Sequence, residues 1–242
     1  MIDKLFKNLH PNSKAFFNSN NGYLIELLDS SVKQVIEHRK RENTKIVPGQ
    51  PEQILNCFSV DIEKIKVVII GQDPYPQPGV ATGDAFVCLG KHQPSLQILI
   101  RELEKEYGLN DLALSFDGSL QSWKDQGVLL LNSSLSCDEF KPGSHTNYWK
   151  SFMESLVKEL SDLKLSRESM DSIVFVLLGK QAQSFKPYIN ADWHYIIERF
   201  HPAAETYGAN KFIGFFKETN YYLCQHQQSM INWFPAQIVE IS

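Results

Sequence analysis

VVIIGQDPYPQPG, residues 67–79, joins an apolar run to a loop rich in glycine and proline. The run Val67–Ile70 is typical of a strand buried on both faces of a sheet, and Gly71 ends it. The turn residues that follow fix an irregular backbone, into which the strand delivers Asp73 and Tyr75. Composition alone leaves two interpretations open: a rigid surface turn in which Asp73 caps the backbone, and a functional loop at the end of a sheet strand.

Three further apolar runs predict strands at residues 128–131, 173–178 and, with a weaker pattern, 195–197. Between them, Tyr148–Leu160 carries the 3.6-residue apolar stripe of an amphipathic helix, and Ser95 is expected to cap another helix. Strands that alternate with helices predict a parallel α/β sheet covered by helices on both faces. Such sheets place their sites at the carboxyl ends of the strands.

The composition excludes several classes of protein without pointing to a partner. The chain has 242 residues, of which 43% are hydrophobic and 21% charged, and this is typical of a soluble globular protein rather than a disordered, collagenous or coiled-coil one. Its 24 basic and 28 acidic side chains give a net charge of −4, whereas nucleic-acid binders are usually basic. We expect one domain over residues 1–242, with 1–45 forming a helical extension packed on the motif-bearing region 46–234.

The cysteines and the N-terminus indicate the compartment. The four cysteines have no C-x-x-C spacing, so we expect reduced, mostly buried thiols rather than a zinc or redox site. The N-terminus, MIDKLFKNLH, lacks the apolar run of a signal peptide, and no segment approaches the length of a membrane span. The expected location is cytoplasmic, or nuclear or host-cell if the source is eukaryotic or viral.

Candidate site residues follow the predicted strands. His201 precedes a proline after the fourth strand and could face Asp73 across the strand ends, as in general acid–base or charge-stabilising chemistry, although a lone histidine is more often structural. Asn132 follows the second strand and could cap a helix or read a nucleobase edge. Three others are ambiguous when taken alone, since a phenylalanine is more often core and a lysine more often solvated: Phe86, Lys180 and Lys211.

Taken together, in this order and spacing, these segments resemble the family 1 uracil-DNA glycosylases. The motifs that carry the resemblance are GQDPY at 71–75, Phe86, GVLLLNSSLS at 127–136, SIVFVLLGKQAQSF at 172–185 and HP at 201–202. The block 145–156, KETN at 217–220 and INW at 231–233 also fit. The resemblance covers roughly residues 46–234 and implies a three-layer α/β/α fold around a central, four-stranded, mostly parallel sheet.

The resemblance also implies an activity and the residues that perform it. The family extrudes uracil from DNA and hydrolyses its N-glycosidic bond, which leaves an abasic site and free uracil. In this chain, Asp73 would stabilise the sugar cation and position the attacking water, and His201 would donate a hydrogen bond to a uracil oxygen. The implied uracil-binding residues are Gln72, Tyr75, Phe86 and Asn132. Phe86 would stack on the base, Asn132 would read its edge, Tyr75 would exclude the methyl group of thymine, and no metal ion or other cofactor is implied.

The DNA-contacting positions implied by the resemblance depart from the family pattern more than the pocket does. They are Pro76, Ser95, Gly179, Lys180, Ala203, Ala204, Glu205, Tyr207 and Lys211. Pro76 replaces a histidine, and Glu205 lies where a DNA-intercalating leucine is expected, so we expect it to repel phosphates and Tyr207 or Phe212 to replace the leucine. The stretch Gly179–Lys217 nevertheless carries five basic against three acidic side chains.

DPYP, the glycine–lysine pair after the third strand and HPAA are similar to the poxviral branch of the family, in which the glycosylase also serves in a polymerase processivity factor. The alternative function is therefore a catalytically weak DNA-binding or replication-processivity subunit on the same fold. The expected partner is uracil-containing DNA, single- or double-stranded, with a proteinaceous glycosylase inhibitor or a replication protein as further candidates. We expect a monomer that does not associate with membranes.

Overall fold

Four strands form the central sheet of the computed structural model, which describes residues 1–109, 116–165, 172–207 and 212–234. The strands are β2 (Val67–Gly71), β3 (Val128–Asn132), β5 (Val174–Leu178) and β6 (Tyr195–Arg199). All are parallel, in the order β3-β2-β5-β6. The four predicted strands are confirmed, and the weakest continues to Arg199 because its last residues pair with the end of β5.

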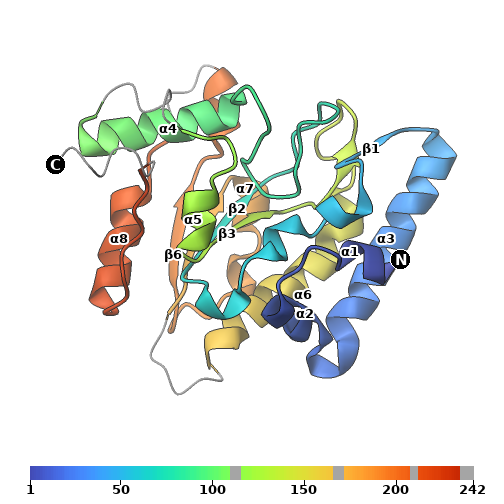
Figure 1. Ribbon diagram of the computed structural model, residues 1–242, viewed down its shortest axis with the longest axis horizontal. Helices are drawn as coiled ribbons and strands as arrows, with labels where there is room; N and C mark the ends of the chain where they lie inside the picture. Colours follow the sequence, from blue (N-terminus) through green and yellow to red (C-terminus); the bar gives the residue numbers. More distant parts are fainter. Residues whose placement is uncertain (110–115, 166–171, 208–211, 235–242) are drawn as a thin grey trace.

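Side chains of the sheet alternate between its two faces, as the pleat requires. In β2, Val68 and Ile70 join one buried apolar cluster, whereas Val67 and Ile69 join another on the opposite face. Strands β2, β3 and β5 are buried throughout and therefore have no polar face, which explains why they appear in the sequence as continuous apolar runs, whereas β6 carries the exposed Glu198. Helices cover both faces (Figure 1), and the expected three-layer α/β/α fold is confirmed.

One face of the sheet is covered by α6 (Thr146–Leu165) and the N-terminal helices α1 (Ile2–Leu5), α2 (Pro11–Asn18) and α3 (Tyr23–Glu42). The apolar stripe predicted over 148–160 is confirmed, since Trp149, Phe152 and Leu156 are fully buried. Helix α3 packs on α6, and both lie on the right in Figure 1. The short 3-10 helix η1 (Asn20–Gly22) joins α2 to α3, and three more precede β2: η2 (Pro51–Gln53), η3 (Asn56–Ser59) and η4 (Ile62–Lys64).

The other face is covered by α4 (Pro94–Tyr107), α5 (Gln121–Asp125) and α8 (Phe216–Gln225). The buried indoles of Trp123 and Trp233 pack edge to face here, with their ring centroids 5.0 Å apart. The prediction that Ser95 caps α4 is wrong. Gln93 is the N-cap residue and the helix begins at Pro94, whose fixed φ and missing N–H suit the first helical position.

Strands β1 (Ile46–Val47) and β4 (Cys137–Asp138) form a separate, antiparallel pair. Short helices follow the last two strands of the central sheet: α7 (Lys180–Gln183), η6 (Lys186–Tyr188) and η7 (Pro202–Tyr207). Thus β4 lies in the chain between the end of β3 and α6, and η7 comes shortly after β6.

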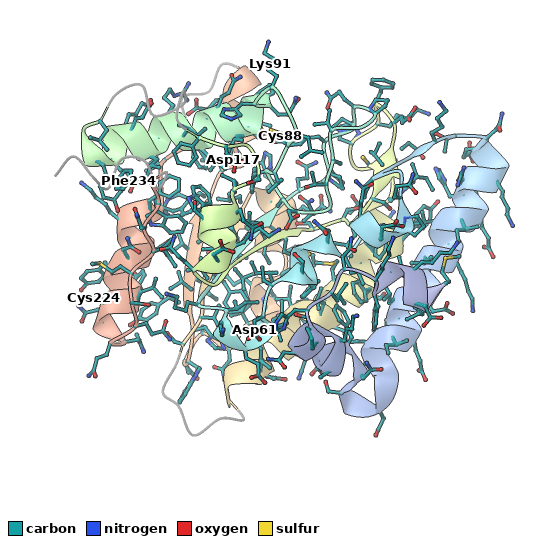
Figure 2. All side chains as sticks on the ribbon, viewed as in Figure 1. Asp61, Cys88, Lys91, Asp117, Cys224 and Phe234 are labelled. Atoms are coloured by element: carbon teal, nitrogen blue, oxygen red, sulfur yellow. The ribbon has the colours of Figure 1, made fainter. Side chains whose placement is uncertain are left out.

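The cysteines are free thiols, as the sequence predicts. Cys57, Cys88 and Cys137 are buried, whereas Cys224 is exposed on the outer part of α8, on the left in Figure 2. None of the helices in the described part of the chain is long and apolar enough to cross a membrane.

Candidate active site

A cavity of about 420 Å³ lies at the carboxyl ends of β2, β3 and β6. The last residues of β2 and β3, Gly71 and Asn132, are paired in register, so the loops that follow them begin at the same edge of the sheet. The predicted site residues that line the cavity are Gln72, Asp73, Tyr75, Pro76, Phe86, Ser95, Asn132, His201 and Ala203. Its volume falls in the range of about 300–1,000 Å³ that is usual for small-ligand sites.

Asp73 is the principal acidic group of this cavity. Neither of its buried carboxylate oxygens forms a well-aligned hydrogen bond with a described residue, although the Gln72 side chain and the Gly143 amide lie close enough to lower its pKa. Burial raises the pKa of Asp73 to about 6, and the polar groups of Gln72 and Gly143 offset that effect only in part. The carboxylate is therefore ionised at neutral pH and poorly stabilised until a positive charge or a water molecule comes next to it. The interpretation of Asp73 as a backbone cap receives no support from these contacts.

His201 follows β6 and has a defined tautomer. Its Nδ1 accepts a hydrogen bond from the Ala203 amide at 3.1 Å, so in the neutral ring the proton is on Nε2. Burial lowers the pKa of His201 to about 4, and the ring is therefore a neutral donor at pH 7. Gly179 at the end of β5 permits this position, because its φ is +91° and a Cβ there would lie 3.0 Å from the Cβ of His201.

Phe86 is held in an uncommon conformation over the end of β2. Its φ is +66°, a left-handed conformation that costs a non-glycine residue on the order of 1–3 kcal/mol. Its carbonyl accepts a hydrogen bond from the Tyr75 hydroxyl at 3.2 Å, and its ring stacks on that of His201 with centroids 5.8 Å apart. Gly71 leaves room for the phenyl ring, since a Cβ there would lie 2.9 Å from Phe86 Cζ.

Asn132 is the last residue of β3, and its side chain is almost completely buried. Its Nδ2 has no hydrogen-bond partner within the described part of the chain. The neighbouring Ser133 and Ser134 amides donate to the carbonyls of Gly71 and Gln72 at 3.1 and 3.0 Å, which fixes the two loops against each other. Asn132 caps no helix, so of its two interpretations the recognition of a ligand edge remains.

Comparison with known proteins gives the same family as the motifs. Residues 59–224 match the family described as the uracil DNA glycosylase superfamily. A uracil-DNA glycosylase of Borreliella burgdorferi is 37% identical over 221 residues, which cover 88% of this chain and 94% of the relative. One from Azobacteroides pseudotrichonymphae is 35% identical over 212 residues, 83% and 90% of the two chains. The chain belongs to the uracil-DNA glycosylase superfamily.

The fold agrees with that assignment. The crystal structure of mimivirus uracil-DNA glycosylase superposes with a TM-score of 0.75 and 26% sequence identity, covering 95% of this chain and 88% of that one. The predicted family, fold and enzyme class are confirmed. The protein is a DNA-repair glycosidase that excises uracil from DNA.

The predicted DNA-contacting residues surround the cavity of this glycosylase unevenly. Pro76, Ser95 and Ala203 line it, and Gly179 touches His201. Lys180 is exposed at the start of α7. The remaining positions lie in η7 or beyond it: Ala204, Glu205 and Tyr207 belong to η7, and Lys211 lies outside the described residues.

Two expectations for the loop after His201 are wrong. Glu205 does not present a free negative charge to phosphates, because it forms an ion pair with Arg101 of α4 and its side chain is only 8% exposed. Phe212 is buried, at 3% exposure, and cannot intercalate. The local sequence does not reveal the ion pair of Glu205, since residue 101 is 104 positions away.

The loop between β4 and α6 also contributes to the cavity, although the motifs do not predict it. Pro142 lines the cavity, and the Phe140 amide donates to the Pro76 carbonyl at 2.9 Å. The Pro142–Gly143 dipeptide is an ordinary turn signal, which predicts a turn but not the element against which it packs.

Proposed function

We propose that uracil is released by charge stabilisation on both sides of the breaking bond, with Asp73 facing the sugar and His201 the base. The observation that supports this most strongly is the presence in one cavity of three buried polar atoms without partners, Asp73 Oδ1, Asp73 Oδ2 and Asn132 Nδ2. Buried polar atoms are almost always hydrogen-bonded, so an unpartnered group in a cavity is most simply explained by a ligand.

The chemical step needs no strong acid. The bond between the sugar C1′ and uracil N1 breaks, and its electron pair leaves with the base. The Nε2–H of His201 then donates to the uracil oxygen on which negative charge develops, and the Asp73 carboxylate stabilises the positive charge on the sugar. A water molecule adds to C1′ and transfers its proton to Asp73, while the uracil anion takes a proton from solvent.

Base recognition follows from the same geometry. Asn132 Nδ2 donates to uracil O4 and its Oδ1 accepts from N3–H, a pattern that cytosine reverses. Phe86 supplies an apolar stacking surface, and we assign the main chain around Gln72 a further contact. Tyr75, held by its bond to the Phe86 carbonyl, occupies the space that the thymine methyl group would need.

Incubation with oligonucleotides that contain uracil, cytosine or thymine at one position tests this proposal, with abasic sites as the readout. Wild-type protein should create abasic sites at uracil alone, and Asn132→Ala should lose most of that activity because uracil O4 and N3–H are left without partners. No release from uracil at high enzyme concentration would refute the proposal and favour the alternative, a catalytically weak DNA-binding subunit.

We also propose that the glycosylase acts as a monomer and that a proteinaceous inhibitor can cover the cavity. The three residues on which the proposed chemistry depends, Asp73, Asn132 and His201, meet within the fold of a single chain. A variant of mimivirus UNG that is 26% identical, with a TM-score of 0.76, was crystallised in complex with UGI. Sedimentation of the protein alone and inhibition of uracil release by added UGI test the two parts separately.

A further inference from the structure

A second group of ionisable side chains lies outside the uracil cavity. His38 on α3, Asp138 on β4 and His145 just before α6 each offer one donor atom, and the three atoms lie within 4.8 Å of one another. His38 Nε2 is 3.0 Å from Asp138 Oδ2, and His145 Nε2 is 3.2 Å from Asp138 Oδ1. Three elements that are distant in sequence thus direct two imidazoles at one carboxylate.

The outer nitrogens of both imidazoles are already held by hydroxyl groups. His145 Nδ1 lies 2.9 Å from Ser136 Oγ, which also accepts a hydrogen bond from Trp149 Nε1 at 2.8 Å. His38 Nδ1 lies 3.2 Å from the Tyr148 hydroxyl and 3.5 Å from the Arg41 guanidinium, Nη2. Partners at the outer nitrogen fix the ring orientation and leave Nε2 directed inward, as is usual for histidines that bind metals.

Burial and charge suit a cation at the centre of the cluster. The side chains of His145, Asp138 and His38 are 0%, 3% and 12% exposed.

We propose that His38, Asp138 and His145 form a Zn²⁺ site. Zinc takes imidazole nitrogen and carboxylate oxygen at about 2.0–2.2 Å in a tetrahedron, which separates neighbouring donors by about 3.3 Å. The contacts of 3.0–3.2 Å between the carboxylate and the two rings need to change by only a few tenths of an ångström. Two nitrogen ligands disfavour Mg²⁺ and Ca²⁺, which prefer oxygen. A water molecule would complete the tetrahedron.

The site is structural and is independent of the proposed chemistry. None of its three residues lines the uracil cavity, so the implied absence of a metal from the reaction is unaffected. The site nevertheless adjoins the cavity wall, because Asp138 directly precedes the loop between β4 and α6. In this loop, the Phe140 amide donates to the Pro76 carbonyl and Pro142 lines the cavity. Zinc would fasten α3 and α6 to the start of that loop.

Metal content after dialysis against buffered Zn²⁺ tests the proposal, together with the visible spectrum after Co²⁺ substitution. All variants should carry Cys224→Ser, which removes an exposed thiol on α8, a helix at the opposite side of the molecule from α3 (Figures 1 and 2). The parent should bind one Zn²⁺ per chain, show tetrahedral Co²⁺ bands and melt at a higher temperature with zinc.

Ligand variants decide between a built site and adventitious binding. Asp138→Asn and His145→Gln should lose the bound zinc and the Co²⁺ bands, and Tyr148→Phe should weaken zinc binding by about tenfold. The partly exposed His38→Gln serves the same purpose if the buried variants do not fold. His10→Gln is the matched control, since His10 and Asp61 form a histidine–carboxylate pair that belongs to no three-ligand group among the described residues. No zinc in the parent, or equal zinc in His38→Gln and the parent, would overturn the proposal.

Discussion

The uracil cavity and the loops around it differ in how their polar and charged side chains are stabilised. In the cavity, the carboxylate oxygens of Asp73 and the side chain of Asn132 are buried near strand ends, and their polar atoms lack a well-aligned hydrogen bond. In the surrounding loops, Glu205 is neutralised by Arg101, and Lys180 is exposed to solvent. The cavity thus holds buried polar groups that a substrate can stabilise, whereas each of these two loop charges already has an oppositely charged partner or water, even though Glu205 Oε1 itself has no hydrogen bond among the described residues.

This difference explains why the two regions depart from the family pattern to different extents. The cavity residues are positioned by a parallel sheet whose strand register is fixed, and their chemistry tolerates little displacement. The loops are expected to contact a flexible, uniformly charged DNA backbone, so different side chains can serve. We therefore expect the absence of the family's leucine to affect how uracil reaches the cavity more than what happens inside it, with Tyr207 as the remaining candidate to replace that leucine.

Asp73→Asn should have the largest effect. Loss of one preorganised charge in a catalytic site typically costs about 10²–10³-fold in kcat, and we expect that loss for uracil release with little change in KM. The variant should also be more stable at pH 7 by about 1–3 kcal/mol. Burial raises the pKa of Asp73 to about 6, so ionisation of this carboxylate destabilises the folded state increasingly above about pH 4 and fully above about pH 6. Single-turnover rates and thermal melts measure both effects, and an unchanged rate would contradict the role of Asp73.

Tyr75→Ala should change specificity. Removal of the ring opens space for a methyl group, which is worth about 10–200-fold in discrimination. We expect measurable thymine release and a lower uracil rate, since the bond that holds the Phe86 carbonyl is also lost. Tyr75→Phe is the matched control, because it removes that bond but keeps the ring, and thymine release by this variant would show that discrimination lies elsewhere.

The pH dependence should report Asp73 and not His201. The reactive form needs ionised Asp73, so kcat/KM should fall as the pH drops below about 6 and be about tenfold below its plateau at pH 5. The pKa of His201 is lowered to about 4, so this ring stays neutral over the same range and adds no second acid limb. If kcat/KM of Asp73→Asn falls below pH 6 in the same way as that of the wild type, the titrating group is not Asp73.

Arg101→Gln should have the smallest effect, and it acts on the loop. The substitution frees the Glu205 carboxylate next to the DNA, so KM should rise by about 3–10-fold at low salt and recover as salt screens the repulsion. The double variant Arg101→Gln/Glu205→Gln should restore KM. Lys180→Ala is a useful contrast, because it removes a cation without freeing a carboxylate and should simply flatten the salt dependence.

The sequence predicts the sheet and the cavity well, for identifiable reasons. Strands buried on both faces leave continuous apolar runs, and in a parallel sheet the residues that follow those runs converge at one edge. The sequence therefore predicts that Asp73, Asn132 and His201 lie at the same edge of the sheet, and all three line the cavity.

The remaining features depend on contacts between distant segments. Gln93 and Pro94, not Ser95, begin α4, because local helix-capping preferences compete with the fixed φ of proline. The pair between Arg101 and Glu205 joins two helices that no local pattern connects. The same is true of His38 and Asp138, which are 100 positions apart.

Uracil release from matched single-stranded and double-stranded oligonucleotides tests the contrast between cavity and loops most directly. Single-stranded uracil needs no wedge, so a complete cavity should release it efficiently, whereas release from a stable duplex should be slower because unpairing is unassisted. Pairing uracil with guanine, or raising the temperature toward duplex melting, should reduce the difference between the release rates from single-stranded and double-stranded DNA. Equal rates on both substrates would contradict the missing wedge, and no release from the single strand would contradict the complete cavity.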